Sequence, residues 1–340
     1  MMRCRRQQGV VLLVVLFFAL LLTASIATFI RRSTIDALVA RNRDQAAQAE
    51  ALARGGVRLG RSILILDREL KLASENPVDS HLDEWFQIDP SGIPAGEGAE
   101  LQLRIEDSGS RFNLNSAFDH AKGGEPFPET EPFLHQFFEK VIDEMDIPPG
   151  EKFYDVSDLA EALIDWIDAN DVRLKGGIED DYYQQQTPPY RAANRPLLSI
   201  DELFLIEGFD RKLVAQLRPY ITVTPFVGGG GVNLNTAPPH ILALLFFNDG
   251  VDERLAHEDE VKQILDIRED GGLLCGESLS LDGCTPITSI VPNQIFPEPT
   301  YAASVFTIVA DASVGEIHRS VEAVINRAAD PPLVLSWKVR

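Results

Sequence analysis

The chain has 340 residues, 24% of them charged, and a formal net charge of −21 at pH 7. The first 60 residues hold +6 of that total, so the remainder holds −27 and forms a strongly acidic body. Neutralisation of phosphates by Lys and Arg dominates nucleic-acid affinity, so this body disfavours a DNA or RNA partner and leaves cations and basic protein surfaces as candidates.

An uncharged run extends from Val10 to Ile30 near the N-terminus. At 1.5 Å per residue, a helix of this length crosses the ~30 Å hydrocarbon core of a bilayer. The run is too long for the apolar region of a secretory signal peptide, which has about 7 to 15 residues. Because Arg3, Arg5 and Arg6 precede it, we expect a single-pass membrane protein with a cytoplasmic N-terminus and its acidic body on the other side of the membrane.

The helical pattern continues beyond the membrane. Alanines alternate with polar residues from Asp36 to Leu66, and the first proline of the chain is Pro77. We therefore predict one helix of roughly 50 residues, loosened at Gly55 and Gly56.

Two regions have the pattern of strands. Residues 100–106 (ELQLRIE) alternate apolar and polar side chains before a turn, and residues 303–310 and 316–326 predict a hairpin with its turn at 311–315. Between these regions, residues 117–290 are mainly helical in pattern, as in 131–146 and 157–169. The expected fold is α+β: a small sheet packs on the N-terminal helix and carries a large helical insertion.

The insertion contains a short internal repeat: the Asn-Leu-Asn of residues 111–115 (RFNLN) occurs again in residues 232–236 (VNLNT). Asn or Thr ahead of a helix can cap its free N–H groups, as Thr236 could before Pro238 and Pro239. Residues 199–217 and 236–267 also resemble helix-hairpin-helix or SAM-like units. Such units often bind DNA, but Glu207 and Asp210 flank Gly208 where a phosphate would lie, so we expect a structural module.

An acidic stretch in the first part of the insertion is a candidate cation site. Calcium takes six to eight oxygen ligands, carboxylates included. The stretch is not an EF-hand, since Val172 and Arg173 occupy positions that need an oxygen ligand and a glycine. On the residues alone, a solvated acidic loop with Trp166 and Tyr182 in the core is the alternative. The candidate ligands are Asp165, Asp168, Asn170, Asp171, Glu179, Asp180 and Asp181.

Cysteine usage and catalytic motifs add little. Cys275 and Cys284 are nine residues apart and could form a disulfide in an extracytoplasmic compartment. The six His are scattered, and neither G-x-S-x-G nor H-E-x-x-H occurs. The glycines at 228–231 are not followed by the Lys-Ser/Thr of a phosphate-binding loop, so we interpret them as a flexible linker. We expect no enzymatic activity.

The N-terminus resembles a class III leader of the type IV pilin kind, because residues 5–9 (RRQQG) directly precede the apolar helix. The resemblance implies cleavage by a prepilin peptidase after Gly9 and N-methylation of Val10. Ordinary pilins carry Glu at the fifth mature position, where this chain has Val14. A charge at mid-membrane costs ~2.5–3.5 kcal/mol without a partner. In pilin-like assemblies this Glu is thought to neutralise the N-terminal amine of a neighbouring subunit, so the absence of the acid suits a subunit with no neighbour above it. The alternative is that Val14 is only a residue that faces lipid.

Residues 163–171 (LIDWIDAND), 176–183 (GGIEDDYY) and 188–194 (PPYRAAN), with the two Asn-Leu-Asn segments, closely resemble the general secretion pathway protein K family. The resemblance covers nearly the whole chain. It implies a minor pseudopilin at the tip of the type II secretion pseudopilus, with structural calcium in the insertion. The implied partners are other minor pseudopilins, the inner-membrane secretion platform and the prepilin peptidase. A type IV pilus minor pilin and a membrane-anchored helix-hairpin-helix DNA-binding protein are the alternatives.

The expected organisation has seven parts: leader 1–9, transmembrane helix 10–30, periplasmic stalk 31–66, first sheet part 67–116, first SAM-like domain 117–224, second SAM-like domain 225–292 and second sheet part 293–340.

Overall fold

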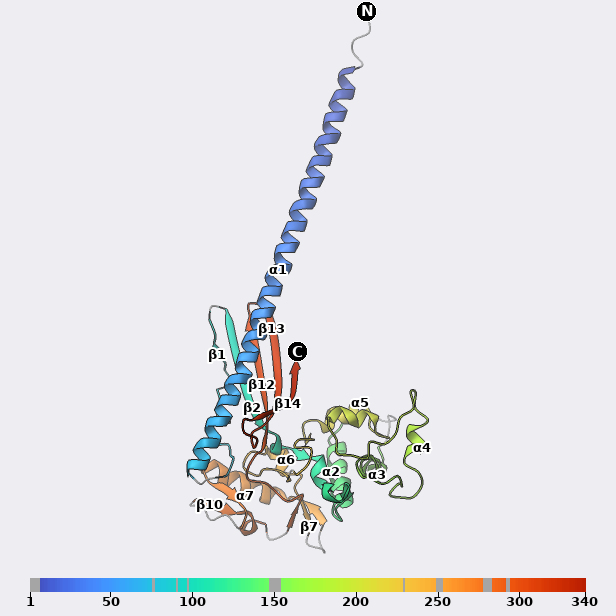
Figure 1. Cartoon of the computed structure of the whole chain (residues 1–340), viewed down its shortest axis with the longest axis vertical. Helices are drawn as coiled ribbons and strands as arrows, with labels where there is room; N and C mark the ends of the chain where they lie inside the picture. Colours follow the sequence, from blue (N-terminus) through green and yellow to red (C-terminus); the bar gives the residue numbers. More distant parts are fainter. Residues whose placement is uncertain are drawn as a thin grey trace, which may run out of the picture.

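The fold is given by a computed structural model in which one long helix rises from a body made of a sheet and a lobe of short elements (Figure 1). The structure describes residues 7–74, 77–89, 91–96, 98–146, 154–228, 230–248, 253–277, 283–291 and 294–340. Residues 1–6 of the expected leader lie outside this range.

Helix α1 extends without a break from Gln7 to Ser74, 68 residues. Its N-terminal part is exposed, and it is long and apolar enough to cross a membrane. The helix is longer than expected and is not loosened at its glycines. A Cβ on Gly56 would lie 2.8 Å from Leu101 Cδ1 and 2.9 Å from Ala310 Cβ, whereas a Cβ on Gly55 would meet nothing within 4 Å. Gly56 therefore allows α1 to approach the sheet closely.

The sheet has the order β1-β2-β12-β13-β14, with antiparallel neighbours throughout. Alternate residues of the central strands face α1 and form a core with it, among them Ile105, Ile308 and Ala323, which pair side by side. The strands are β1 (Ile93–Pro94), β2 (Ala99–Asp107), β12 (Val305–Val314), β13 (Ile317–Asn326) and β14 (Leu333–Val339).

The expected strand at 100–106 and the expected hairpin are both present, but the turn of the hairpin was placed too early. Residues 311–314 continue β12, because Ala310 and Ala312 are both buried against α1. The chain reverses at Gly315, which has φ +61°, and Glu316.

The lobe lies between β2 and β12 in the chain. Its longer helices match the expected ones closely at their starts, and α3 stops two residues early because Asp168 is extended, with φ −68° and ψ 161°. The helical elements are η1 (Ser108–Ser110), η2 (Leu114–Ala117), η3 (His120–Lys122), α2 (Thr130–Asp143), α3 (Val156–Ile167), α4 (Asp180–Tyr183), η4 (Ile200–Leu205), α5 (Arg211–Leu217), α6 (Pro239–Leu242), α7 (Glu258–Glu269) and η5 (Ile287–Ser289). The strands are β3 (Phe112–Asn113), β4 (Phe118–Asp119), β5 (Glu125–Pro126), β6 (Ile221–Thr222), β7 (Phe246–Asn248), β8 (Glu253–Leu255), β9 (Leu273–Cys275), β10 (Cys284–Pro286) and β11 (Gln294–Phe296).

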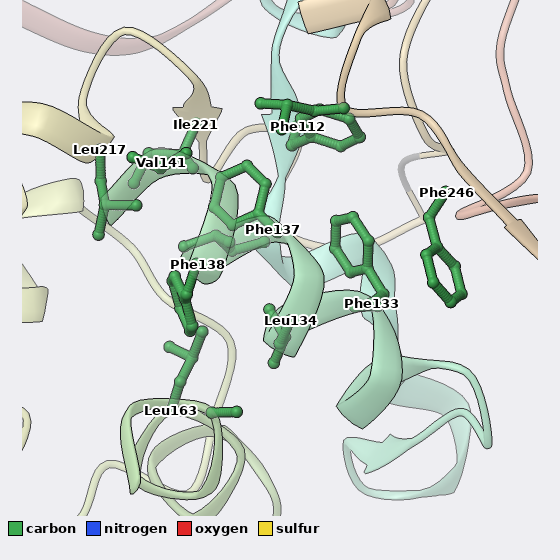
Figure 2. Packing of buried hydrophobic residues seen from close by; sticks show 14 of the residues in the cluster. Phe112, Phe133, Leu134, Phe137, Phe138, Val141, Leu163, Leu217, Ile221 and Phe246 are labelled. Carbon is green, nitrogen blue, oxygen red and sulfur yellow. The ribbon is translucent and has the colours of Figure 1, made fainter. Parts of the chain in front are cut away.

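Aromatic residues of α2 form the centre of the lobe (Figure 2). Phe133, Phe137 and Phe138 are all buried, and the Phe112 ring lies 5.5 Å from the centroids of both Phe133 and Phe137. The spacing of these residues places them on one helix face, which packs against α3 through Leu163 (Figure 2). The lobe therefore has a core of its own, separate from the core between α1 and the sheet.

The second half of the lobe, expected to be a helical SAM-like domain over residues 225–292, also contains strands. The hairpin β7–β8 separates α6 from α7, and β11 pairs with β7 through Ile295 and Phe247, so this half extends beyond residue 293. The apolar pair Phe246-Phe247 is fully buried, which a short strand inside the core permits. In the first half, η4 and α5 meet near Gly208, which has φ +89°, in agreement with the expected glycine turn.

Candidate functional site

Three acidic side chains converge at the C-terminal end of α3. Asp165 lies in the last turn of the helix, Asp168 caps it, and Glu179 returns to them through a small hairpin closed by the Val172–Ile178 bridge. One carboxylate oxygen from each of the three lies within 4.8 Å of the others. All three side chains are buried, with 3%, 6% and 2% of their surface exposed.

The hydrogen bonds of this cluster are incomplete. Asp165 Oδ1 accepts from the Leu174 N–H at 2.9 Å, and Asp168 Oδ1 accepts from the Asn170 N–H at 3.2 Å. Asp165 Oδ2 and both carboxylate oxygens of Glu179 have no hydrogen-bond partner among the described residues. A buried charge without a partner is costly, so an arrangement of this kind needs protons or a cation.

Burial is the largest cause of the perturbed acidity of the cluster. Burial, followed by repulsion from Asp168 and Asp165, raises the pKa of Glu179 to about 8. Burial raises the pKa of Asp165 to about 6, and it raises the pKa of Asp168 above its ordinary value. The donor set consists of carboxylate oxygens with free lone pairs, the ligands that calcium prefers, so these residues fit a calcium ion.

Three of the other four candidate ligands have different partners. Asn170 Oδ1 accepts from the Val172 N–H at 2.7 Å, Asp171 Oδ1 accepts from Asn194 Nδ2 at 3.2 Å, and Asp180 Oδ1 accepts from the Ala192 N–H at 3.1 Å. Asp181 is exposed. The structure therefore brings together three of the seven residues that the sequence singled out.

Aromatic rings pack behind the cluster. Trp166 follows Asp165 on α3, and its ring lies 5.2 Å from that of Tyr183, which is buried. The expected core residue Tyr182 is only partly buried, since neighbouring residues of α4 point in different directions. The interpretation as a solvated loop therefore holds for the exposed residues Asn170, Asp171 and Asp181 and fails for the buried residues Asp165, Asp168 and Glu179.

The two Asn-Leu-Asn segments have a role that the sequence did not show. Asn115 Nδ2 donates to the Leu197 carbonyl at 2.9 Å, and its Oδ1 accepts the Leu197 N–H at 2.8 Å. Asn235 makes the same pair of bonds to Leu274. Each segment therefore binds the backbone of a leucine that is distant in sequence. The repetition of the Asn-Leu-Asn motif was the signal that could have indicated that both segments have the same role.

Thr236 does not cap a helix, contrary to expectation. Pro238 stands at the N-cap of α6, and Thr236 Oγ1 instead donates to Asp107 Oδ2 at 2.8 Å. Asp107 also accepts from the Asn233 side chain at 2.9 Å and from the Gly109 N–H at 2.6 Å. Burial raises the pKa of Asp107 to about 6. This carboxyl joins the end of β2 to the second half of the lobe.

A second buried network joins the end of α1 to the sheet. Arg327 donates to Asp67 Oδ2 at 2.5 Å and to Asp79 Oδ2 at 2.6 Å. Lys71 pairs with Asp79 and also with Asp83, the latter at 2.6 Å. These alternating charges hold the end of α1 against the segment before β1 and the end of β13. Burial raises the pKa of Asp67 to about 6.

The remaining candidate residues lie far from the acidic cluster. Cys275 and Cys284 sit on the paired strands β9 and β10 with their Cα atoms 6.0 Å apart, and the structure joins them in a disulfide. Gly9 and Val10 lie in the first turns of α1, and Val10 is exposed.

Comparisons with known proteins agree on one family. The family model described as type II secretion system (T2SS), protein K matches residues 110–226. The type II secretion system protein K of Pseudomonas aeruginosa is 28% identical over 96% of this chain and 90% of its own length. The protein of the same name from Klebsiella pneumoniae is 30% identical over 71% of this chain and 69% of its own length.

A solved structure has the same fold. It is a chain of the GspK-GspI-GspJ complex from the enterotoxigenic Escherichia coli type 2 secretion system, with a TM-score of 0.59 and 22% identity. The match covers 88% of this chain and 99% of the other.

Proposed function

Because this chain belongs to the type II secretion system protein K family and is a minor pseudopilin of type II secretion, we propose that it occupies the tip of the pseudopilus. The observation that carries this proposal is the position of the lobe. The lobe lies at the end of α1 that is farthest from the apolar segment, and it extends to one side well beyond the helix (Figure 1). Such bulk suits a position above which no subunit has to pack.

Val14 supports the same position. In the proposed mature protein it is the fifth residue, and it is apolar and exposed on α1. A subunit at the tip has no neighbour above it whose N-terminal amine needs an acidic partner within the bilayer. An uncharged residue then avoids an unpaired charge that would cost ~2.5–3.5 kcal/mol in the membrane.

The proposed topology follows from the two ends of α1. Arginines at 3, 5 and 6 favour a cytoplasmic N-terminus in the inner membrane, and the acidic body then lies in the periplasm. A disulfide between Cys275 and Cys284 suits that oxidising compartment. The prepilin peptidase would cut between Gly9 and Val10 and methylate Val10.

The proposed partners are two other minor pseudopilins and the inner-membrane secretion platform. The structure of similar fold is a complex of three named chains, GspK, GspI and GspJ, which is the basis for expecting two partners. The role is one of assembly and not of catalysis. The alternative of a DNA-binding helix-hairpin-helix protein is weakened because the acidic Glu207 lies beside Gly208, where a phosphate would bind. Glu207 also pairs with Arg173, a cation that could otherwise contact DNA.

We assign the three converging carboxylates to a structural calcium ion. Asp165, Asp168 and Glu179 would hold it, and the ion would supply the positive charge that their unpaired oxygens lack. The consequence for the chain is local: α3, the hairpin at 172–178 and the start of α4 would be tied together at one point. The bound ion would then stabilise this part of the lobe against local unfolding.

Two measurements test the proposed function. Mass spectrometry of the chain expressed with its prepilin peptidase should find an N-methylated Val10; an intact Met1 or a cut beyond Ile30 would refute the processing. Immunogold labelling of assembled pseudopili should then mark one end only. Label along the whole length would refute the tip position.

A further inference from the structure

Strand β14 forms an open edge of the sheet. Among the described residues, β13 pairs with its inner side and no strand pairs with its outer side. Leu333 is 56% exposed and Trp337 40% exposed, although an edge facing water usually carries polar residues. The apolar residues of the strand are Leu333, Val334, Leu335, Trp337 and Val339.

The register shows which backbone groups are free. Ser320 and Arg340 exchange two backbone hydrogen bonds of 3.1 and 2.9 Å, so this pair is a hydrogen-bonded one. Bonded and non-bonded pairs alternate along an antiparallel ladder. Lys338 therefore directs its N–H and C=O toward β13, whereas Trp337 and Val339 direct theirs toward the open edge.

The open strand is held in place by α1. Arg61 donates to the Pro332 carbonyl at 2.8 Å, and Arg68 donates to the carbonyls of Arg327 and Ala329 at 3.0 Å each. These bonds fix the segment that leads into β14, so the edge is rigid before any partner arrives. A preformed edge lowers the entropic cost of binding an extended strand.

Devices that usually protect an edge are sparse here. Lys338 is the charged residue within β14, the prolines at 331 and 332 precede the strand, and the register shift lies opposite its start, at Val324 and Ile325. The stretch from Ser336 to Val339 is left regular and open. Such an edge is a template for pairing with another chain.

We propose that β14 accepts an antiparallel strand from a neighbouring minor pseudopilin of the same fold, an inference that rests on the proposed function. The occupant must complete the backbone hydrogen bonds of Trp337 and Val339, which only an extended chain can do. Its side chains would alternate, with apolar residues beside Trp337 and Val339 and polar residues beside Lys338.

Strand direction selects the occupant. β14 runs back toward the N-terminal end of α1, whereas β2 runs away from it (Figure 1). Two copies joined antiparallel through their β14 strands would point their α1 helices in opposite directions, which one membrane cannot anchor. A neighbour that offers its β2-type edge keeps the strands antiparallel and the long helices parallel. In a second copy of this chain, β1 already covers Glu100 and Leu101 of that edge, so a different subunit fits better.

The test uses the full-length chain in detergent, purified alone and with the other minor pseudopilins of its own system. In the complex, hydrogen exchange at the amides of Trp337 and Val339 should slow at least tenfold relative to the chain alone. Val339→Pro removes one outward N–H and keeps the bonds to β13, because proline is tolerated at a sheet edge. We expect it to lower partner recovery about tenfold, while the matched Val339→Ala changes recovery less than twofold.

The outcomes separate this inference from the proposed function. A complex that forms with both amides still exchanging as in the free chain would overturn the inference and leave the partnership intact. Failure of the native chain to recover any partner would overturn both. Slowed exchange in the chain alone at high concentration would show a second copy on the edge and refute the proposed occupant. The exchange measurement needs no variant, so a folding defect of Val339→Pro cannot obscure the result.

Discussion

Asn235 binds both peptide groups of Leu274: its amide donates to the Leu274 carbonyl at 2.9 Å, and its side-chain oxygen accepts the Leu274 N–H at 2.8 Å. Asn115 holds Leu197 with the same two distances in the first half of the lobe. Both asparagines and both leucines are buried, so each asparagine satisfies a backbone N–H and C=O that water does not reach. The two halves of the lobe are thus organised around equivalent amide clamps.

Replacing Asn235 by Leu should lower the free energy of unfolding by about 2–4 kcal/mol, because it leaves the buried N–H and C=O of Leu274 without partners. Denaturant unfolding of the full chain in detergent measures the change. Asn42→Leu is the control, since Asn42 is exposed on α1 and should change stability little. Equal effects of the two substitutions would contradict the clamp.

The neighbouring glycines of α1 should respond to alanine with opposite signs. Gly56→Ala places a methyl group 2.8 Å from Leu101 Cδ1 and should destabilise the chain by about 1–3 kcal/mol through overpacking. Gly55→Ala faces open space and should stabilise the helix by about 0.5–1 kcal/mol. Thermal unfolding of both variants tests the packing of α1 on the sheet. A stabilising Gly56→Ala would mean that the helix is not seated on β2 and β12 as described.

The buried Asp107 makes stability depend on pH. Its pKa is about 6 in the folded chain against an ordinary value of 3.8, so between these values the folded state binds more protons than the unfolded state. The contribution of Asp107 to stability should therefore be fully present below its ordinary pKa of 3.8 and be lost as pH rises through about 6. Comparison with Asp107→Asn isolates this effect, because Asp67, whose pKa is also raised to about 6, titrates in both proteins. Parallel pH curves for the two proteins would show that Asp107 titrates at its ordinary value.

Calcium should stabilise the chain through Glu179. With calcium at a hundred times its dissociation constant, the free energy of unfolding should rise by about 2.7 kcal/mol. Glu179→Gln should remove most of this rise, whereas Asp181→Asn, on an exposed side chain of the same loop, should retain it. Isothermal titration and thermal shift measure both proteins. No calcium heat and no thermal shift in the native chain would eliminate the proposed site.

The elements that sequence analysis predicted well are those with strong periodicity. The long uncharged run predicted a helix at the start of α1, and the alternation in β2 and the apolar faces of α2 and α3 indicated which side of each element is buried, so their positions followed directly. The turn of the β12–β13 hairpin was misplaced because Asp311 and Ser313 look like turn residues, although they occupy the outer positions of a long strand. Burial of Ala310 and Ala312 decided the outcome.

The acidic stretch shows where a linear pattern stops being informative. Asp165 and Asp168 are three apart at the end of a helix, which favours a shared position. Glu179 joins them only because the hairpin at 172–178 folds back. Nothing in the amino-acid sequence distinguishes Glu179 from Asp180 or Asp181. The Asn clamps were missed for a related reason, since Leu197 and Leu274 lie 82 and 39 residues from their asparagines.

The unbroken course of α1 has a mechanical consequence. A continuous helix of 68 residues is about 100 Å long, and it contains no proline at which it would bend. At its far end, Asp67 and Lys71 are locked to Arg327, Asp79 and Asp83. A displacement along the helix axis at the membrane therefore reaches the lobe without being absorbed on the way. The long helix can therefore transmit an axial force from the membrane to the lobe, in addition to placing the lobe at the end of the filament.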